Sequence, residues 1–285
     1  MAFYKSWQVL AVDDEPDVLA VTSLSMRNFE VYGLPIQVHA AAGKAEAIDY
    51  LKSEPAVVPS LNVAFIDVVM ETETAGLELC QYIRNDLDNH VTQLYIRTGQ
   101  PGIAPEREVI DLYDINGYFT KVEATENKLY SLVTSGVRQS YSIRWSKIVM
   151  TMLDDIIAGA ESREKITANL QQIFRSMAGE SALHIEASME IDGQRIAISD
   201  LDAAHETKVK RRVENRDSKP LGRDGDRYYV DEHNWHLVVV ASGPDHPEIS
   251  FLFRAMHSVP DNVIYKMQYF LKATATLWAL RATRA

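Results

Sequence analysis

Val9-Leu10-Ala11-Val12-Asp13-Asp14, close to the N-terminus, is the stretch that decides the fold of the first half of this 285-residue chain. Its four apolar residues predict a buried strand of a parallel sheet. The two carboxylates then lie at the carboxyl edge of that sheet, where open α/β folds bind ligands. Adjacent carboxylates repel each other, so the pair suits a cation. Taken alone, it fits an ordinary turn or helix N-cap better, because Pro16 suits the first turn of a following helix.

The residues that follow alternate between strand and helix patterns. We expect further strands at 36–38, 62–66, 93–96 and 117–120, and helices at 17–29, 44–51, 77–87, 107–113 and from 126 onward. Five strand–helix units predict a doubly wound, five-stranded parallel sheet with helices on both faces. Right-handed crossovers bring the carboxyl ends of these strands to one edge of the sheet.

Polar side chains follow four of these strands at the point where each strand ends. They are Asp13, Asp14, Asp67, Thr98 and Lys121. Three carboxylates at one edge suit a small divalent cation with oxygen ligands, and Mg²⁺ is the ion we expect. Asp67 stands alone after the central strand and is the candidate nucleophile that would form an acyl phosphate.

The other residues have supporting roles in this hypothesis. Asp13 and Asp14 would hold the metal, together with the main-chain carbonyl of Val69. Lys121 would neutralise phosphoryl oxygens as a point charge, and the Thr98 hydroxyl would donate a hydrogen bond to the phosphoryl group. Each residue alone has an ordinary explanation as a cap, a turn residue or a solvated side chain. Their joint occurrence on successive strand ends indicates phosphoryl transfer.

With these five residues in this order, residues 5–140 closely resemble the receiver domain of two-component response regulators. The resemblance implies a flavodoxin-like fold with a phosphoacceptor at Asp67. It implies phosphoryl contacts from Thr98 and Lys121. The Mg²⁺ ligands that it implies are Asp13, Asp14 and Asp67.

The resemblance also implies a conformational switch, in which Thr98 moves toward the phosphoryl group and Tyr118 turns inward. The ordinary alternative for Tyr118 is a half-buried aromatic residue of a strand. Three departures from the family bear on the switching geometry and the phosphoryl lifetime, and they remove no reactive group. They are Val122 where receivers usually have proline, a loop at 68–76 that lacks the usual proline and looks one residue longer, and Gly99 where a slightly larger residue is common.

A more specific resemblance rests on four short motifs in the receiver-like half. They are Arg97-Thr-Gly-Gln-Pro-Gly102, Ala104-Pro-Glu106, Tyr113-Asp-Ile-Asn116 and Lys128-Leu-Tyr130. They are similar to a receiver subgroup in which a GAF-like sensory domain follows. Many members of that subgroup then carry a cyclic-di-GMP phosphodiesterase of the HD-GYP type.

The second half begins with helical patterns. An apolar stripe at alternating steps of four and three residues comprises Trp145, Val149, Met152 and Ile156. It fits a coiled coil and a helix packed on its own domain about equally. Gly159 ends this helix, and a further helix is expected over 162–177.

Strand patterns then replace the helical ones. The segments 183–191 and 194–198 predict a hairpin around the turn Asp192-Gly193. Further strands are expected at 227–230, 237–240 and 250–253, and a long helix from 261 to about 281. This arrangement is consistent with an α+β, GAF-like domain with an antiparallel sheet. The domains expected are therefore a receiver at 1–140, a helical linker at 141–160 and a GAF-like sensory or dimerisation domain at 161–285.

Two polar clusters in the second half have competing explanations. Lys208-Val-Lys-Arg-Arg212 would contact a nucleotide, an acidic partner or the acidic receiver edge, but a solvated helix face or loop explains it better. Asp231-Glu-His233-Asn-Trp-His236 contains metal-ligand types. Positions three apart on a strand point to opposite faces, so we interpret this cluster as structural.

Composition excludes several classes of function. The formal net charge is −11, which argues against a nucleic-acid binder and against a polybasic membrane anchor. Cys80 is the only cysteine, so no intrachain disulfide forms and a reducing compartment is expected. No apolar run approaches the length of a membrane span, and the N-terminus does not fit a signal peptide. We expect a cytoplasmic protein.

The function expected is that of a response regulator, which takes a phosphoryl group onto Asp67 from a histidine kinase or a phosphotransfer protein. The change would pass to the GAF-like domain and alter self-association, as a homodimer, or partner binding. Beyond its own phosphorylation and dephosphorylation, no enzyme activity is expected. Two alternatives remain: the regulatory part of a cyclic-di-GMP phosphodiesterase whose catalytic domain is absent from this chain, or a small-molecule sensor acting through the GAF-like domain.

Overall fold

The computed structural model divides the chain into two compact units, residues 4–144 and residues 145–285 together with 1–3. It describes residues 5–53, 61–99, 106–178, 186–199, 201–222, 224–243, 246–255 and 257–281. Residues 183–185 of the first strand predicted for the second half lie outside these ranges, as do residues 100–105 of the subgroup motifs.

The first unit is built on a six-stranded sheet. Its strands are β1 (Trp7–Val12), β2 (Glu30–Val31), β3 (Leu34–Ala41), β4 (Val63–Ile66), β5 (Gln93–Thr98) and β6 (Gly117–Thr120). The order is β2-β3-β1-β4-β5-β6, and the last five strands are parallel. Those five follow the 2-1-3-4-5 order of flavodoxin-like folds, so the predicted fold class is confirmed.

The sheet differs from the prediction at one edge. Strand β2 pairs antiparallel with β3 through a hairpin whose central residues, Tyr32 and Gly33, both have positive φ. This hairpin begins at Glu30, which is why the first helix is shorter than the predicted 17–29.

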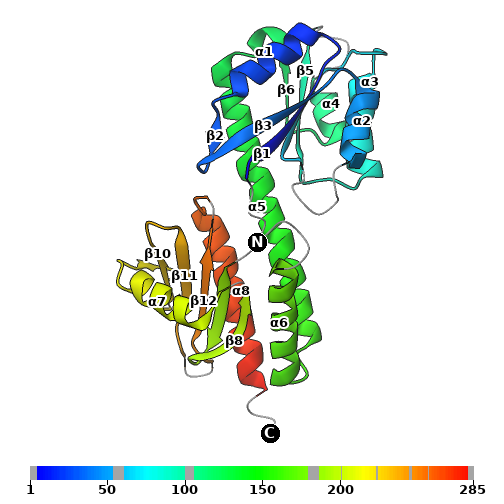
Figure 1. The fold of residues 1–285 in the computed structure, drawn as a ribbon. Coiled ribbons are helices and arrows are strands. Elements are labelled where there is room, and N and C mark those ends of the chain that lie inside the picture. Colours follow the sequence, from blue (N-terminus) through cyan, green and yellow to red (C-terminus); the bar gives the residue numbers. More distant parts are fainter. Residues whose placement is uncertain are drawn as a thin grey trace. The chain divides into compact units, whose positions relative to one another are not determined.

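Helices cover both faces of this sheet (Figure 1). They are α1 (Pro16–Met26), α2 (Lys44–Ser53), α3 (Ala75–Gln81), α4 (Glu106–Tyr113) and the long α5 (Glu126–Ala158). Leu10, Ile66 and Ile96 pack with residues of α2, α3 and α4. Because strand side chains alternate, the neighbouring residues such as Phe65 and Tyr95 face the side of α1 and α5.

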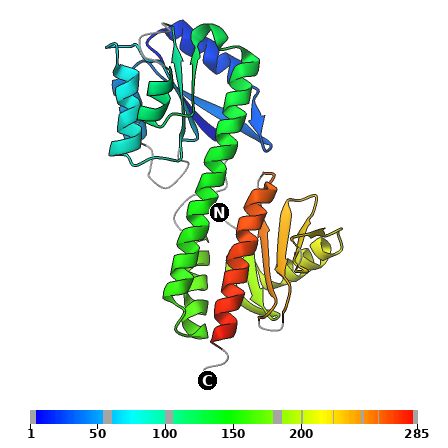
Figure 2. The same cartoon turned by 180° about the vertical axis from the view of Figure 1, so that it is seen from behind.

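The second unit holds an antiparallel sheet between helices (Figure 2). Its elements after α5 are α6 (Arg163–Ala178), β7 (Ala187–Ile191), β8 (Gln194–Ser199), α7 (Ala203–Glu214), β9 (Lys219–Pro220), β10 (Arg227–Val230), β11 (Trp235–Val240), β12 (Ile249–Arg254) and α8 (Asp261–Leu280). The strand order is β8-β7-β12-β11-β10-β9. The α+β class with an antiparallel sheet is therefore confirmed.

Two local predictions in the second unit have clear outcomes. The turn Asp192-Gly193 joins β7 to β8, and both residues have positive φ, as a type I′ hairpin turn requires. The apolar stripe of α5 is buried within the single chain, from Trp145 at 5% exposed to Ile156 at 0%. Of the two alternatives for this stripe, packing inside the fold is the one observed.

The basic cluster lies on helix α7, which Asp202 caps through the amides of Ala204 and His205. Lys210 forms an ion pair with Glu190, and Arg212 with Asp231. These pairs tie α7 to the sheet.

Asp231 has a structural role, as predicted for its cluster. Its carboxylate accepts hydrogen bonds from the amides of His233 and Trp235, which shapes the turn between β10 and β11.

His236 gives the second unit a pH dependence that can be measured. Its ring is buried, stacks between Tyr228 and Phe253, and shares a hydrogen bond with the Tyr228 hydroxyl at 2.6 Å. Burial, with a smaller contribution from His257, lowers the pKa of His236 to about 4. As the pH falls, His236 of the unfolded chain is protonated near pH 6.5, whereas His236 of the folded chain is protonated only near pH 4. Each unit by which the pH falls within that window should lower the free energy of unfolding by up to about 1.4 kcal/mol.

Thermal unfolding of the second unit between pH 6.5 and 5.5 checks this expectation. His236→Phe should flatten the dependence, whereas His233→Phe, an exposed histidine of the same unit, should leave it as in the wild type. Equal slopes in the wild type and His236→Phe would show that another group is responsible.

Among the described residues, no helix is long and apolar enough to cross a membrane.

Candidate functional site

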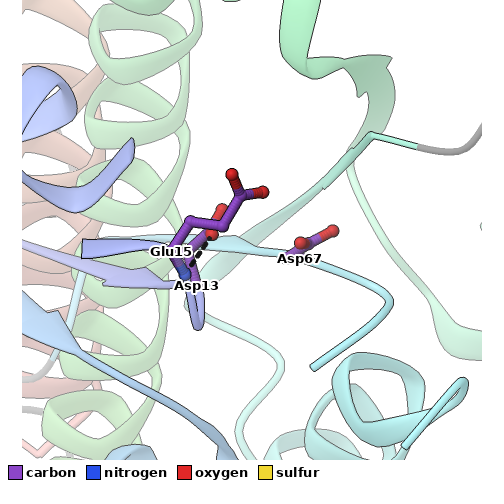
Figure 3. A group of neighbouring side chains, drawn as sticks. All are labelled: Asp13, Glu15 and Asp67. Atoms are coloured by element: carbon purple, nitrogen blue, oxygen red, sulfur yellow. Dashed lines mark hydrogen bonds between the residues drawn. The ribbon is translucent and has the colours of Figure 1, made fainter. Parts of the chain in front are cut away.

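The carboxyl edge of the parallel sheet gathers an acidic cluster. Carboxylate oxygens of Asp13, Glu15 and Asp67 lie within 4.8 Å of one another, and Figure 3 shows the three side chains at the ends of β1 and β4. The sheet ladder itself positions two of them. The Asp13 amide donates to the Ala41 carbonyl, and the Asp67 amide donates to the Val12 carbonyl.

Lys121 lies between these carboxylates. Its Nζ is 2.7 Å from Asp67 Oδ2, 3.1 Å from Asp13 Oδ1 and 2.6 Å from Glu15 Oε1. Burial disfavours the charged amine, but the hydrogen bonds with Asp67, Glu15 and Asp13 outweigh this cost and raise the pKa of Lys121. The amine is therefore a permanent cation in the site.

Asp67, the predicted phosphoacceptor, is buried, as Asp13 and Thr98 are. It is 3% exposed, and its Oδ1 accepts a hydrogen bond from the Val68 amide. Burial raises the pKa of Asp67, Lys121 lowers it, and the charge of Asp13 raises it again. The net shift is upward, so this carboxylate protonates at a higher pH than an ordinary aspartate does.

Asp14 and Glu15 differ from the expected arrangement. Asp14 is exposed and lies outside the described cluster, whereas Glu15 lies within it. The Glu15 amide donates to Asp13 Oδ1 at 3.0 Å, and a hydrogen bond to Lys121 lowers the pKa of Glu15. Glu15 was missed because its carboxylate comes one residue after the adjacent acidic pair, where a helix start is the usual explanation.

The remaining predicted residues lie around the same edge or on the adjacent strand. Thr98 ends β5 and is 1% exposed, and Tyr118 on β6 is half-buried against the core. Val69 follows Asp67 in the loop after β4. The structure brings Asp67, Lys121 and Asp13 together; the roles of Thr98, Tyr118, Asp14 and the Val69 carbonyl stay predictions.

The turn after Lys121 has its own stabilising arrangement in place of the usual proline. A short 3₁₀ turn covers Lys121–Glu123, and Glu123 Oε2 accepts hydrogen bonds from the Thr120 amide and hydroxyl. This capping box holds the turn, and Val122 points into solvent at 93% exposure.

Sequence reasoning also missed Arg97, a second cation beside the cluster. Its Nη2 is 3.1 Å from Asp13 Oδ2, and its side chain is 2% exposed. The sequence carries a signal for this role, since an arginine inside a buried strand almost always has a charged partner.

Comparisons with known proteins bear on both halves of the chain. No family model matches the chain. The 3'3'-cGAMP-specific phosphodiesterase 2 of Vibrio cholerae is 31% identical over 184 residues, which is 64% of this chain and 34% of the relative. The match thus spans about a third of the length of that curated relative.

Among solved structures, similar chains align with about half of this one. A signal receiver domain of an HD domain-containing protein from Pseudomonas fluorescens is 17% identical and covers 50% of this chain and 96% of its own, with a TM-score of 0.42. A response regulator receiver protein from Sinorhizobium medicae is 15% identical and covers 48% and 98%, with a TM-score of 0.38.

The strand order of the first unit is the observation that decides its fold, together with Asp67 and Lys121 at the carboxyl edge. The N-terminal half has a flavodoxin-like fold. In this first unit, the acidic cluster occupies the edge where doubly wound folds bind ligands.

The donor set at this edge of the first unit fits Mg²⁺. Carboxylate oxygens are hard ligands, and a magnesium ion needs only one or two of them because it keeps several waters. Asp13, Glu15 and Asp67 offer three such oxygens at short range of one another.

Proposed function

We propose that this chain is a response regulator that accepts a phosphoryl group on Asp67. The observation that carries this proposal is the position of Lys121 Nζ, 2.7 Å from Asp67 Oδ2 and 3.1 Å from Asp13 Oδ1. That placement sets a permanent cation beside one buried carboxylate at the end of the central strand. Phosphoryl transfer needs positioning and charge neutralisation of this kind more than it needs further covalent chemistry.

An Asp67 oxygen would attack the phosphorus of a phosphohistidine on a histidine kinase or a phosphotransfer protein. The new O–P bond would replace the P–N bond, and the imidazole would leave. Lys121 would then pair with the phosphoryl oxygens, and Thr98 would donate a hydrogen bond to them. Residues that would hold Mg²⁺ are Asp13, Asp67, Glu15 or Asp14, and the Val69 carbonyl. When bound, the ion supplies positive charge at the phosphoryl oxygens.

Labelling with acetyl phosphate and Mg²⁺, followed by intact mass spectrometry, tests the proposal. The wild type should gain one phosphoryl group, and Asp67→Asn should gain none, because the attacking oxygen of the carboxylate is gone. Asp17→Asn is the matched control, since Asp17 is an exposed aspartate at the start of α1. Persistent labelling of Asp67→Asn at the wild-type level would refute Asp67 as the phosphoacceptor.

The output of this site is proposed to be a change in self-association, as a homodimer, or in partner binding through the GAF-like second unit. Light scattering of the phosphorylated and unphosphorylated chain measures the first of these. An unchanged mass would leave partner binding as the output.

The match to the Vibrio cholerae phosphodiesterase favours a second candidate. In it, the chain is the regulatory part of a cyclic-dinucleotide phosphodiesterase. The printed sequence contains no His-Asp, Gly-Tyr-Pro or Glu-Ala-Leu motif. Hydrolysis of cyclic-di-GMP or 3'3'-cGAMP by this 285-residue chain would contradict a purely regulatory role.

A further inference from the structure

Arg97 is a buried cation at the penultimate position of strand β5, close to the end of the strand that carries the site. It stands between Ile96 and Thr98, and its side chain faces the sheet surface covered by α1, because strand residues alternate. Removing a guanidinium from water is costly unless charged and hydrogen-bonding partners compensate. The partners of Arg97 therefore explain why it is there.

Two groups hold the guanidinium from opposite sides. Its Nη2 lies 3.1 Å from Asp13 Oδ2, and its Nη1 donates a 2.6 Å hydrogen bond to Thr22 Oγ1 on α1. The Thr22 hydroxyl in turn donates to the Val18 carbonyl, so its acceptor lone pairs have a fixed direction. Arg97 is thus clamped between β1 and α1.

This clamp determines which oxygen of Asp13 faces the cluster. Asp13 is fully buried, and its Oδ2 is occupied by Arg97. Its Oδ1 accepts from the Glu15 amide and contacts Lys121, and so it lies on the side of Asp67. A rotation of the Asp13 carboxylate would break contacts with all three groups.

We infer that Arg97 is a positioning residue for the metal site, which presents Asp13 Oδ1 to the divalent cation by holding Asp13 Oδ2. This inference rests on the proposed function, because it assigns the cluster to Mg²⁺. Groups that hold a metal-binding carboxylate from behind typically contribute about 10- to 100-fold in metal affinity. The positive charge of Arg97 acts in the opposite direction, since it repels the ion. Positioning of the Asp13 carboxylate has the larger effect on Mg²⁺ affinity.

Isothermal titration calorimetry of the full chain with MgCl₂ separates the two effects. Arg97→Met should weaken Mg²⁺ binding about 10-fold or more, since it frees the carboxylate. Arg97→Lys keeps the charge, but one ammonium does not reproduce the fork that reaches both Thr22 and Asp13, so it should also weaken binding. Thr22→Val should weaken binding in the same direction and by less.

Arg84→Met is the control for a merely structural effect. Arg84 is the other buried arginine that the described residues place in this unit, and it bonds the main-chain carbonyls of Asn89, Thr92 and Asp114, away from the cluster. Thermal unfolding without Mg²⁺ should show lower stability for Arg84→Met, while its Mg²⁺ affinity stays within twofold of the wild type. If Arg97→Met does not fold, Arg97→Lys and Thr22→Val carry the test.

Unchanged or tighter Mg²⁺ binding by Arg97→Met and Arg97→Lys would overturn the inference, and tighter binding by Arg97→Met alone would show that charge repulsion dominates. Suppose that the wild type binds Mg²⁺ and is labelled on Asp67. If Arg97→Met and Arg97→Lys then bind Mg²⁺ as tightly as the wild type does, only the role of Arg97 is refuted. A wild type that is neither labelled nor binds Mg²⁺ refutes the proposed function itself.

Discussion

Lys121→Met is expected to slow acyl-phosphate formation on Asp67 by about 10²- to 10³-fold, the loss typical of removing one charge-stabilising group from an active site. The Lys121 ammonium contacts Asp67, Asp13 and Glu15 together, whereas the contacts described for Arg97, the second cation, are with Asp13 and Thr22. Lys121 also lowers the pKa of Asp67, which burial raises. Its removal should therefore move the midpoint of the labelling rate to higher pH, because the attacking carboxylate then protonates more readily.

Lys128→Met is the matched control for this experiment. It makes the same substitution at an exposed lysine on α5, outside the acidic cluster. Initial rates of labelling with acetyl phosphate, measured across pH 5 to 8 with saturating Mg²⁺, compare the two variants. A Lys121→Met rate within threefold of the Lys128→Met rate would show that Lys121 has no part in the transfer. Thermal unfolding of both variants with Mg²⁺ confirms that each is folded.

Gly76→Ala is expected to destabilise the first unit by about 2 kcal/mol or more, because an added methyl group has no space. A Cβ atom at Gly76 would lie 1.8 Å from the main-chain oxygen of Asp67 and 2.8 Å from its carbonyl carbon. The Gly76 amide also donates to the Val68 carbonyl, so α3 begins directly against the strand end that carries Asp67. The backbone must shift there, and labelling of Asp67 should fall as well.

Gly99→Ala provides the comparison at the same edge of the sheet. A Cβ atom at Gly99 would lie 3.6 Å from Lys121 Cδ, which is ordinary van der Waals contact. We expect its free energy of unfolding to stay within about 0.5 kcal/mol of the wild type. Calorimetric unfolding of the two variants measures the difference. Equal stabilities of Gly76→Ala and Gly99→Ala would contradict the close approach of α3 to Asp67.

The sequence predicted the flavodoxin-like fold of the first half well because the signal for this fold is local. Apolar runs such as Val9–Val12 and 62–66 specify buried parallel strands, and helical periodicity between them specifies the crossovers. The hairpin of β2 and β3 was missed because its turn, Tyr32-Gly33, lacks the usual Asn-Gly or Asp-Gly pair. The sequence does not distinguish a helix from a loop at α7, because its many charges hide the apolar period of the buried Val209 and Val213.

The candidate site was predictable in part for a similar reason. Strand ends of a parallel sheet meet at one edge, so the order Asp13, Asp67, Lys121 along the chain already implies proximity. Which side chains join the cluster does not follow from that order. Asp14 and Glu15 are both exposed, and of the two it is Glu15 that lies in the cluster, through its contact with Lys121.

Apolar period and strand order were enough to predict a five-stranded parallel sheet, an α+β second unit and an edge that carries Asp13, Asp67 and Lys121. The contact of Arg97 with one oxygen of Asp13 arises only when the chain folds, as does the hydrogen bond by which Thr22, 75 residues before Arg97, holds the same guanidinium. A buried charge must find its partners across the fold. Those partners come from wherever the chain packs, and no local pattern records them.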